Sequence, residues 1–170
     1  EELKRRAGLE FIANELKEQW EKDIAAELDT MSEEQIKNYS ARRKNSYDYR
    51  NRLTGFAYKQ GATFLVGPDL EGYYGVPGFG YVEELKHFAR SGLSNHDILK
   101  AATYNMSIAR ETEVDEGTIK TGANANLVVL NKNPLDNIEN VSSMEYVVLR
   151  GNVFSKSELM EVLRTLPLYH

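Results

Sequence analysis

The chain has 170 residues, a net charge of −5 and a sequence pI of about 5.3. This length excludes a complete β/α barrel, which needs roughly 250 residues, and the acidic balance argues against a nucleic-acid partner or a basic membrane-binding surface. No apolar run approaches the roughly 20 residues that span a bilayer, and the lack of cysteine excludes disulfides but leaves the compartment open.

Apolar residues recur every three to four positions at the start of the chain, at Leu9, Ile12, Leu16, Trp20, Ile24 and Leu28. This spacing predicts one amphipathic helix from about Glu2 to Leu28, whose apolar stripe must be covered. Thr30 or Ser32 is expected to cap a second helix, since Ser32-Glu33-Glu34-Gln35 is a capping-box pattern, and this helix is predicted to run toward Gly61. Because the first residue is Glu1 rather than Met, we expect a cleaved or truncated start.

The second predicted helix carries cations interleaved with aromatic residues: Lys37, Arg42, Arg43, Lys44, Arg50 and Arg52 with Tyr39, Tyr47 and Tyr49. Aromatic rings stack on bases and cations meet phosphates, so a nucleic-acid surface is one interpretation. The negative net charge favours a solvated helix face instead. These cations are also suited to facing a neighbouring helix or subunit.

A short apolar run, Thr63-Phe64-Leu65-Val66-Gly67-Pro68-Asp69, predicts a buried strand that ends in a carboxylate. An acid at such a place needs hydrogen bonds, a cation or a metal to compensate for lost hydration. Catalytic groups of β/α barrels lie at the C-terminal ends of the strands, so Asp69 is a candidate metal ligand or general base. The simpler interpretation is an acid that caps the following turn.

The next segment, Leu70 to Gly80, is a glycine-rich loop that lacks the Gly-Lys-Ser/Thr ending of a phosphate-binding loop. Since loops at this end of a barrel line the active site, Tyr73 and Tyr74 are candidate walls of a substrate pocket. An ordinary glycine-rich turn with surface tyrosines is the competing interpretation.

The remaining chain is predicted to contain helices and then a small sheet. A helix covers Glu83 to Ser91, and another begins at Ser94, which with Asp97 gives a capping pattern. Asn126 to Asn131 reads as a strand, and Met144 to Phe154 as a hairpin around Arg150-Gly151-Asn152. A last helix opens at Ser155 and Ser157 and runs through Arg164.

The order of these motifs carries a family resemblance from about Arg52 to Gly151. The Gly-Pro-Asp strand end is followed by a paired helix motif, by Gly117-Thr118-Ile119 and by Asn126-Leu127-Val128-Val129-Leu130, Asn133-Pro134-Leu135 and Arg150-Gly151. This resembles the C-terminal part of the metal-dependent amidohydrolases, especially their imidazolonepropionase-like and prolidase-like branch. The resemblance implies an α/β to α+β fold: a C-terminal fragment of a hydrolase β/α barrel, helices plus the last barrel strand, with part of a small composite β-sandwich domain.

By this resemblance the chain divides into three parts. Residues 1–112 hold helices and the last barrel strand, residues 113–154 hold part of the composite β-sandwich domain, and residues 155–170 form a C-terminal helix and tail. In the family the other strands of that sandwich come from the N-terminus of the complete polypeptide. Unpaired strand edges attract other chains, so we expect a homo-oligomer for the isolated piece.

The resemblance implies that Asp69 binds the metal and takes a proton from the metal-bound water before passing it to the leaving group. Two residues depart from the family pattern. Pro68 replaces the usual threonine, which removes a hydroxyl and a backbone donor beside the acid. Asn126 replaces the usual aspartate of an Ala-Asp-Leu motif, which removes a charge.

The family's other metal ligands, a His-x-His pair and further histidines, have no counterpart here. The histidines of this chain are His87, His96 and His170, and cysteine is absent, so one copy cannot assemble a zinc site of the usual type. His87 is more simply an exposed or half-buried helix residue, and His96 belongs to a helix start. We therefore expect a divalent metal, with zinc as the expected ion, in the full-length protein and none tightly bound here.

The sequence thus predicts the C-terminal segment of an amidohydrolase that cleaves a carbon-nitrogen bond, and the segment alone is expected to be inactive. Its expected partners are the N-terminal remainder of the same polypeptide and a small-molecule amide, with no nucleic acid and no membrane. The competing hypothesis is a non-catalytic α+β module derived from this fold that serves in binding or oligomerisation.

Overall fold

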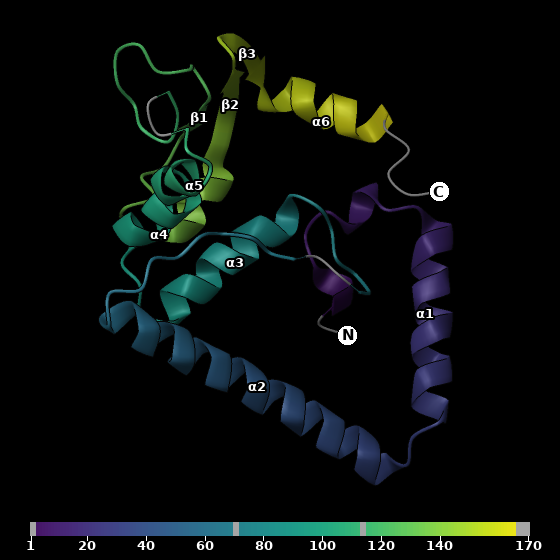
Figure 1. The fold of residues 1–170 in the computed structure, drawn as a ribbon. Helices are drawn as coiled ribbons and strands as arrows, with labels where there is room; N and C mark the ends of the chain where they lie inside the picture. Colours follow the sequence, from purple (N-terminus) through teal and green to yellow (C-terminus); the bar gives the residue numbers. More distant parts are fainter. Residues whose placement is uncertain (1–2, 70–71, 113–114, 166–170) are drawn as a thin grey trace.

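The computed structural model describes residues 3–69, 72–112 and 115–165 as a mainly helical chain with one small sheet (Figure 1). The helical elements are η1 (Leu3–Arg5), η2 (Leu9–Phe11), α1 (Asn14–Asp29), α2 (Glu33–Lys59), α3 (Phe79–Arg90), α4 (Asn95–Ala102), α5 (Tyr104–Ala109), η3 (Ile138–Ser143) and α6 (Lys156–Thr165). The strands are β1 (Leu127–Leu130), β2 (Met144–Leu149) and β3 (Asn152–Ser155).

The single helix predicted from Glu2 to Leu28 is wrong, because two short 3-10 turns precede α1. Gly8 adopts a φ of 89° and Ile12 is extended, with φ −90° and ψ 133°, so the backbone cannot continue one helix through them. A Cβ at Gly8 would collide with the ring of Phe79, so tertiary packing also requires glycine there. The apolar stripe is buried at Ile12 but becomes exposed by Leu28.

The predicted start of α2 is confirmed in atomic detail. The Ser32 hydroxyl accepts a hydrogen bond from the Gln35 backbone N–H at 3.2 Å, and the Gln35 side chain accepts one from the Ser32 N–H at 2.7 Å. From the shared linker the axes of α1 and α2 diverge (Figure 1). Gly55 is the buried residue of α2, packed so closely on the Ser91 carbonyl of α3 that a Cβ would not fit.

The strand predicted for Thr63 to Asp69 is not formed in the described structure. A strand needs a neighbour to share its ladder of hydrogen bonds, and none of the described segments pairs with these residues. Side chains supply two substitutes: the Asn105 amide donates to the Phe64 carbonyl at 3.0 Å, and the Glu84 carboxylate accepts from the Gly67 N–H at 3.2 Å. The barrel assignment of this segment stays a prediction.

The core lies where this segment meets α3, α4 and η3. Its buried members are Val66, Leu85, Phe88, Leu93, Ile98, Ala101 and Ile138. The ring of Phe64 packs on Phe88 with centroids 5.6 Å apart. The predicted burial of this run holds for Val66 but not for Leu65, which is 42% exposed, and the run packs on helices rather than between strands.

The three strands form one antiparallel sheet in the order β1-β2-β3. Leu149 pairs with Asn152, so the β2–β3 hairpin has a two-residue turn. Both turn residues have positive φ, 50° at Arg150 and 81° at Gly151, as the right-handed twist of a hairpin favours. The predicted strand, hairpin and C-terminal helix are confirmed.

Both faces of this sheet are apolar. Leu127, Val148 and Val153 lie in register on one face, and Val128, Val147 and Phe154 lie in register on the other. Val153 and Val128 are 62% and 58% exposed. A sheet with apolar side chains on two faces is typical of a structure that is covered on both sides. None of the helices in the described ranges combines the length and apolar character needed to cross a bilayer.

Candidate functional site

Asp69 lies at the end of the segment that packs on α3, and its side chain is exposed. Its φ of 43° falls in the left-handed region, which aspartate tolerates better than most residues. The neighbouring Pro68 has no N–H to offer the carboxylate. The carboxylate therefore keeps access to water, and its predicted role as metal ligand or general base stays a prediction.

The two candidate pocket tyrosines have opposite environments. Tyr73 is 37% exposed, whereas Tyr74 is only 3% exposed. Tyr74 also has a φ of 61°, and its buried hydroxyl has no hydrogen-bond partner among the residues that the structure describes. The surface interpretation therefore fails for Tyr74, and their predicted roles as walls of a substrate pocket stay a prediction.

Left-handed backbone at Asp69 and Tyr74 differs from the other non-glycine cases in the described chain. Glu111 follows the C-cap residue of α5 and Arg150 lies in the hairpin turn, and positive φ is ordinary at both places. Such conformations cost of order 1–3 kcal/mol each and cluster at functional sites. Asp69 directly precedes the glycine-rich segment in the sequence and Tyr74 lies within it, and a functional role for this segment stays a prediction.

The N-terminal segment packs on this loop. The rings of Trp20 and Tyr74 have centroids 5.2 Å apart, and those of Phe11 and Phe79 have centroids 5.9 Å apart. The guanidinium of Arg6 donates to the Tyr74 carbonyl at 3.5 Å. Periodicity indicated that the apolar stripe of α1 is covered, but only the fold reveals that the Tyr74 loop covers part of it.

The histidines do not form a metal site in the described chain. His87 is half-buried and its ring stacks on Tyr47 with centroids 6.0 Å apart. His96 is exposed beside Asp97, and His170 lies outside the described residues. No group of three His, Cys, Asp or Glu side chains in the described ranges is arranged to hold a metal ion. Asp69 would be a single ligand, so these residues do not fit a metal centre by themselves.

Burial lowers the pKa of His87 and the nearby Arg90 lowers it further, whereas Glu83 and Glu84 raise it. A neutral imidazole is favoured in this environment, packed between α2 and α3. The simpler interpretation of His87 as a half-buried helix residue is therefore confirmed.

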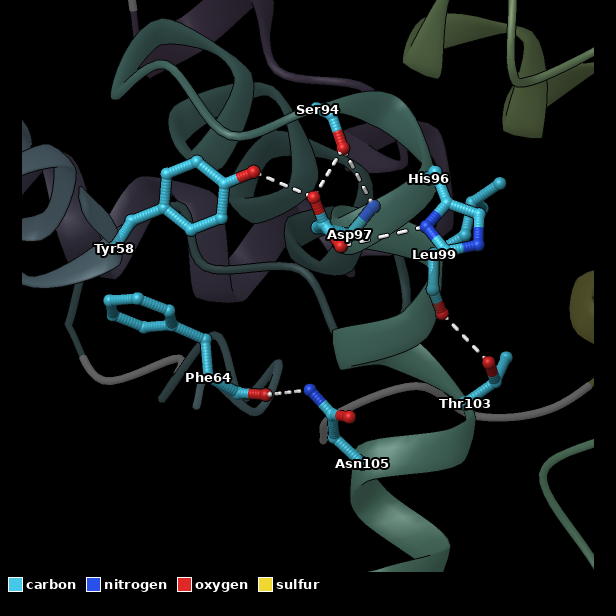
Figure 2. Close-up of polar contacts among 8 residues, drawn as sticks. All are labelled: Tyr58, Phe64, Ser94, His96, Asp97, Leu99, Thr103 and Asn105. Atoms are coloured by element: carbon cyan, nitrogen blue, oxygen red, sulfur yellow. Dashed lines mark hydrogen bonds and ion pairs between the residues drawn. The ribbon is translucent and has the colours of Figure 1, made fainter. Parts of the chain in front are cut away.

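A polar network around Asp97 joins α2 to the start of α4 (Figure 2). The Asp97 carboxylate accepts hydrogen bonds from Tyr58 at 2.6 Å and from Ser94 at 2.5 Å, while the Asp97 N–H donates to the Ser94 hydroxyl at 3.1 Å. The bond from Ser94, followed by that from Tyr58, lowers the pKa of Asp97. The predicted capping by Ser94 is confirmed. The hydrogen bond between Asp97 and Tyr58 of α2 was not predicted from the sequence.

An open hollow of about 260 Å³ lies apart from the tyrosine loop, between α3 and η3. Its charged lining residues are Lys86, Arg90, Asp136 and Glu139. Two cations and two carboxylates line it, so it favours no ligand of one charge. Neither Asp69 nor the two tyrosines line this hollow.

The fold is similar to several solved hydrolase structures. A Xaa-Pro dipeptidase with methionine bound in its active site is 22% identical, with a TM-score of 0.56 over 62% of this chain and 25% of that one. A putative prolidase from Bifidobacterium longum is 27% identical, with a TM-score of 0.52 over 59% and 25%. Molinate hydrolase is 20% identical, with a TM-score of 0.55 over 69% and 27%. This chain thus spans about a quarter of each of these structures.

No protein-family model matches the sequence, and no curated protein does. The structural neighbours nevertheless include prolidase-like and amidohydrolase structures, which agrees with the broad resemblance seen in the sequence. The imidazolonepropionase-like branch stays a prediction.

Proposed function

We propose that this chain is the C-terminal part of a metal-dependent amidohydrolase that hydrolyses a carbon-nitrogen bond in a small amide or dipeptide. The observation that carries the proposal is the similarity of its fold to prolidase and amidohydrolase structures, of which it spans about a quarter. In this proposal residues 1–112 complete a barrel, residues 113–154 join a composite β-sandwich, and the N-terminal remainder of the polypeptide supplies the rest.

The exposed apolar surfaces support a larger whole. Both faces of the three-stranded sheet carry exposed valines, and Tyr49, Leu53 and Phe56 are exposed at helical spacing on α2. Exposed apolar patches of this kind are typical of surfaces that meet another part of a protein. We propose that the N-terminal remainder covers them.

In this proposal Asp69 is the acid-base residue. Its carboxylate accepts a proton from the attacking water as the carbon-oxygen bond forms, and passes that proton to the nitrogen as the carbon-nitrogen bond breaks. General acid-base catalysis of this kind contributes about 10² to 10⁴ in rate. A divalent metal, with zinc as the expected ion, belongs to the complete polypeptide, since the described residues lack a set of three ligands.

The test begins with the reading frame upstream of Glu1, which should encode a His-x-His pair and two further histidines. The complete polypeptide should then hydrolyse dipeptides, hydantoins or lactams, and Asp69→Asn should lower kcat by about 10² or more. Asp48→Asn, on the exposed surface of α2, is the matched control and should keep the wild-type rate. An upstream frame without these histidines, or an Asp69→Asn enzyme of full activity, would contradict the proposal.

The second candidate is a non-catalytic α+β module for binding or oligomerisation. The observation that favours it is the sheet with two exposed apolar faces, which is suited to meeting a second chain. Metal content separates the two candidates, because only the hydrolase predicts an ion that the complete polypeptide binds and the 170-residue chain does not retain.

A further inference from the structure

We infer that the segment Arg6–Trp20 is a strap that anchors Tyr74 and thereby presents Tyr73, the residue before it, as a substrate-selecting residue. This inference rests on the proposed hydrolase function and adds to it a positioning element and a specificity residue.

The strap holds the loop at several points. The Trp20 and Tyr74 rings are tilted by 56° to each other, while the Phe11 and Phe79 rings stack at 24°. The Arg6 guanidinium adds a hydrogen bond to the Tyr74 carbonyl. Aromatic pairs contribute about 0.5–1.5 kcal/mol each beyond the burial of their area. The strap therefore contacts the loop at Tyr74 and contacts Phe79, where α3 begins.

Tyr74 tolerates two unfavourable features in this arrangement. Its backbone is left-handed, and its buried hydroxyl has no partner among the described residues. An unpaired buried hydroxyl costs about 1–3 kcal/mol. The tilted ring contact with Trp20 and the hydrogen bond from Arg6 offset part of these costs.

Tyr73 is the outward-facing member of the pair. It precedes the anchor directly and follows Asp69 by four positions in the chain. With 37% of its surface exposed, against 3% for Tyr74, it offers a ring face and a hydroxyl to a ligand. An aromatic ring packs on an apolar side chain or ring, and its hydroxyl donates to a carbonyl or carboxylate. The ligand class that fits is therefore a small amide with an apolar group next to the scissile bond.

The anchor is tested by nitrating tyrosines with tetranitromethane and locating the products by peptide mass spectrometry. Tyr73 should react at a rate close to that of Tyr49, which is 60% exposed, while Tyr74 should react about tenfold more slowly. Trp20→Ala should remove most of this protection, and Trp20→Phe should restore it because a ring still covers Tyr74. Equal nitration of Tyr73 and Tyr74 in the wild-type chain overturns the inference.

The substrate role is tested in the complete polypeptide with dipeptides that bear large or small apolar side chains. Trp20→Ala and Tyr73→Phe should each raise KM about tenfold with kcat changed less than about twofold, and Trp20→Phe should restore KM. Loss of kcat at unchanged KM overturns the selecting role. A wild-type polypeptide that cleaves no amide overturns the proposed function and, with it, the role of Tyr73, whereas the nitration result still decides the strap.

Discussion

At the residue scale, the hydroxyl groups of Tyr58 and Tyr74 show how much a partner matters. The Tyr58 hydroxyl donates to Asp97 at 2.6 Å, whereas the buried Tyr74 hydroxyl has no partner among the described residues. A hydrogen bond to a charged group contributes about 1.5–3 kcal/mol when buried and less when solvent competes, as it does at the partly exposed Asp97.

Substituting each tyrosine by phenylalanine tests this difference. Tyr74→Phe should leave the free energy of unfolding unchanged or raise it by about 1 kcal/mol. The substitution removes a buried hydroxyl whose lost hydration is not replaced by a hydrogen bond to a described residue. Tyr58→Phe is the matched control and should lower the free energy of unfolding. Urea denaturation followed by circular dichroism measures both. A Tyr74→Phe protein less stable than Tyr58→Phe would show that Tyr74 has a bonding role.

Local polar motifs are the residue contacts that the sequence predicts well. Ser32 with Gln35 and Ser94 with Asp97 lie three positions apart, so a sequence pattern determines both partners. Tyr58 and Asp97 are 39 positions apart, and no local pattern links them. No local pattern predicts the contact of Asn126 either, since its side chain accepts a hydrogen bond at 2.9 Å from the N–H of Arg150, 24 positions away in the hairpin turn. An amide oxygen performs this role as a carboxylate oxygen would, so the missing charge leaves the turn intact.

At the element scale, the contact between α2 and α3 includes the titratable ring of His87. The ring of His87 stacks on Tyr47, and burial followed by the positive charge of Arg90 lowers its pKa. The unfolded chain has the ordinary histidine pKa of 6.5, so below this pH it binds a proton more readily than the folded chain does. The free energy of unfolding should therefore decrease as the pH falls through this range.

Urea denaturation at about pH 7.5 and about pH 5.5 measures this dependence. His87→Phe keeps a ring on Tyr47 but cannot titrate, so its stability should change less between the two pH values. His96→Gln is the matched control, because the His96 side chain is 76% exposed, and it should retain the wild-type pH dependence. Identical pH dependence in His87→Phe and the wild type would contradict the assignment.

The predictions of elements were correct where interactions between residues close in sequence determine the structure. The hairpin follows from a turn whose residues adopt positive φ, and the caps of α2 and α4 follow from Ser32 and Ser94. The strand predicted at Thr63 failed because an apolar run indicates burial, whereas a strand also needs a neighbouring strand. The prediction of one long first helix failed because Gly8 packs against the Phe79 ring with a positive φ and the buried Ile12 is extended, which helical periodicity does not reveal.

At the scale of the whole molecule, the sheet exposes apolar side chains that another part of a protein would normally bury. Val129, Tyr146 and Val153 lie on one face and are 43%, 39% and 62% exposed. We expect the isolated chain to self-associate through this sheet, since apolar faces and open strand edges favour pairing with another copy. Alternation along the strands indicates which residues share a face of the sheet. It does not indicate what covers that face, because the covering surface belongs to another part of the assembly.

Analytical ultracentrifugation over a range of concentrations measures this association. Replacing Val129 and Val153 together by lysine should shift the chain toward monomer, because it places two charges on the exposed face. Ile119→Lys is the matched control, since Ile119 is 90% exposed and lies outside the sheet. A wild-type chain that stays monomeric at every concentration would rule out the sheet as a contact surface.

The strap also turns the first half of the chain into a ring. Arg6 and Tyr74 are 68 positions apart and in contact, so this contact closes a loop of the chain that contains α1 and α2. Closing a loop of this length costs about 4 kcal/mol in chain entropy, while the buried core cluster begins at Val66 and uses no residue of the strap. On heating, the contacts of Arg6 and Trp20 with Tyr74 should therefore break before the core unfolds. Helix α1 would then detach while α3, α4 and η3 stay packed.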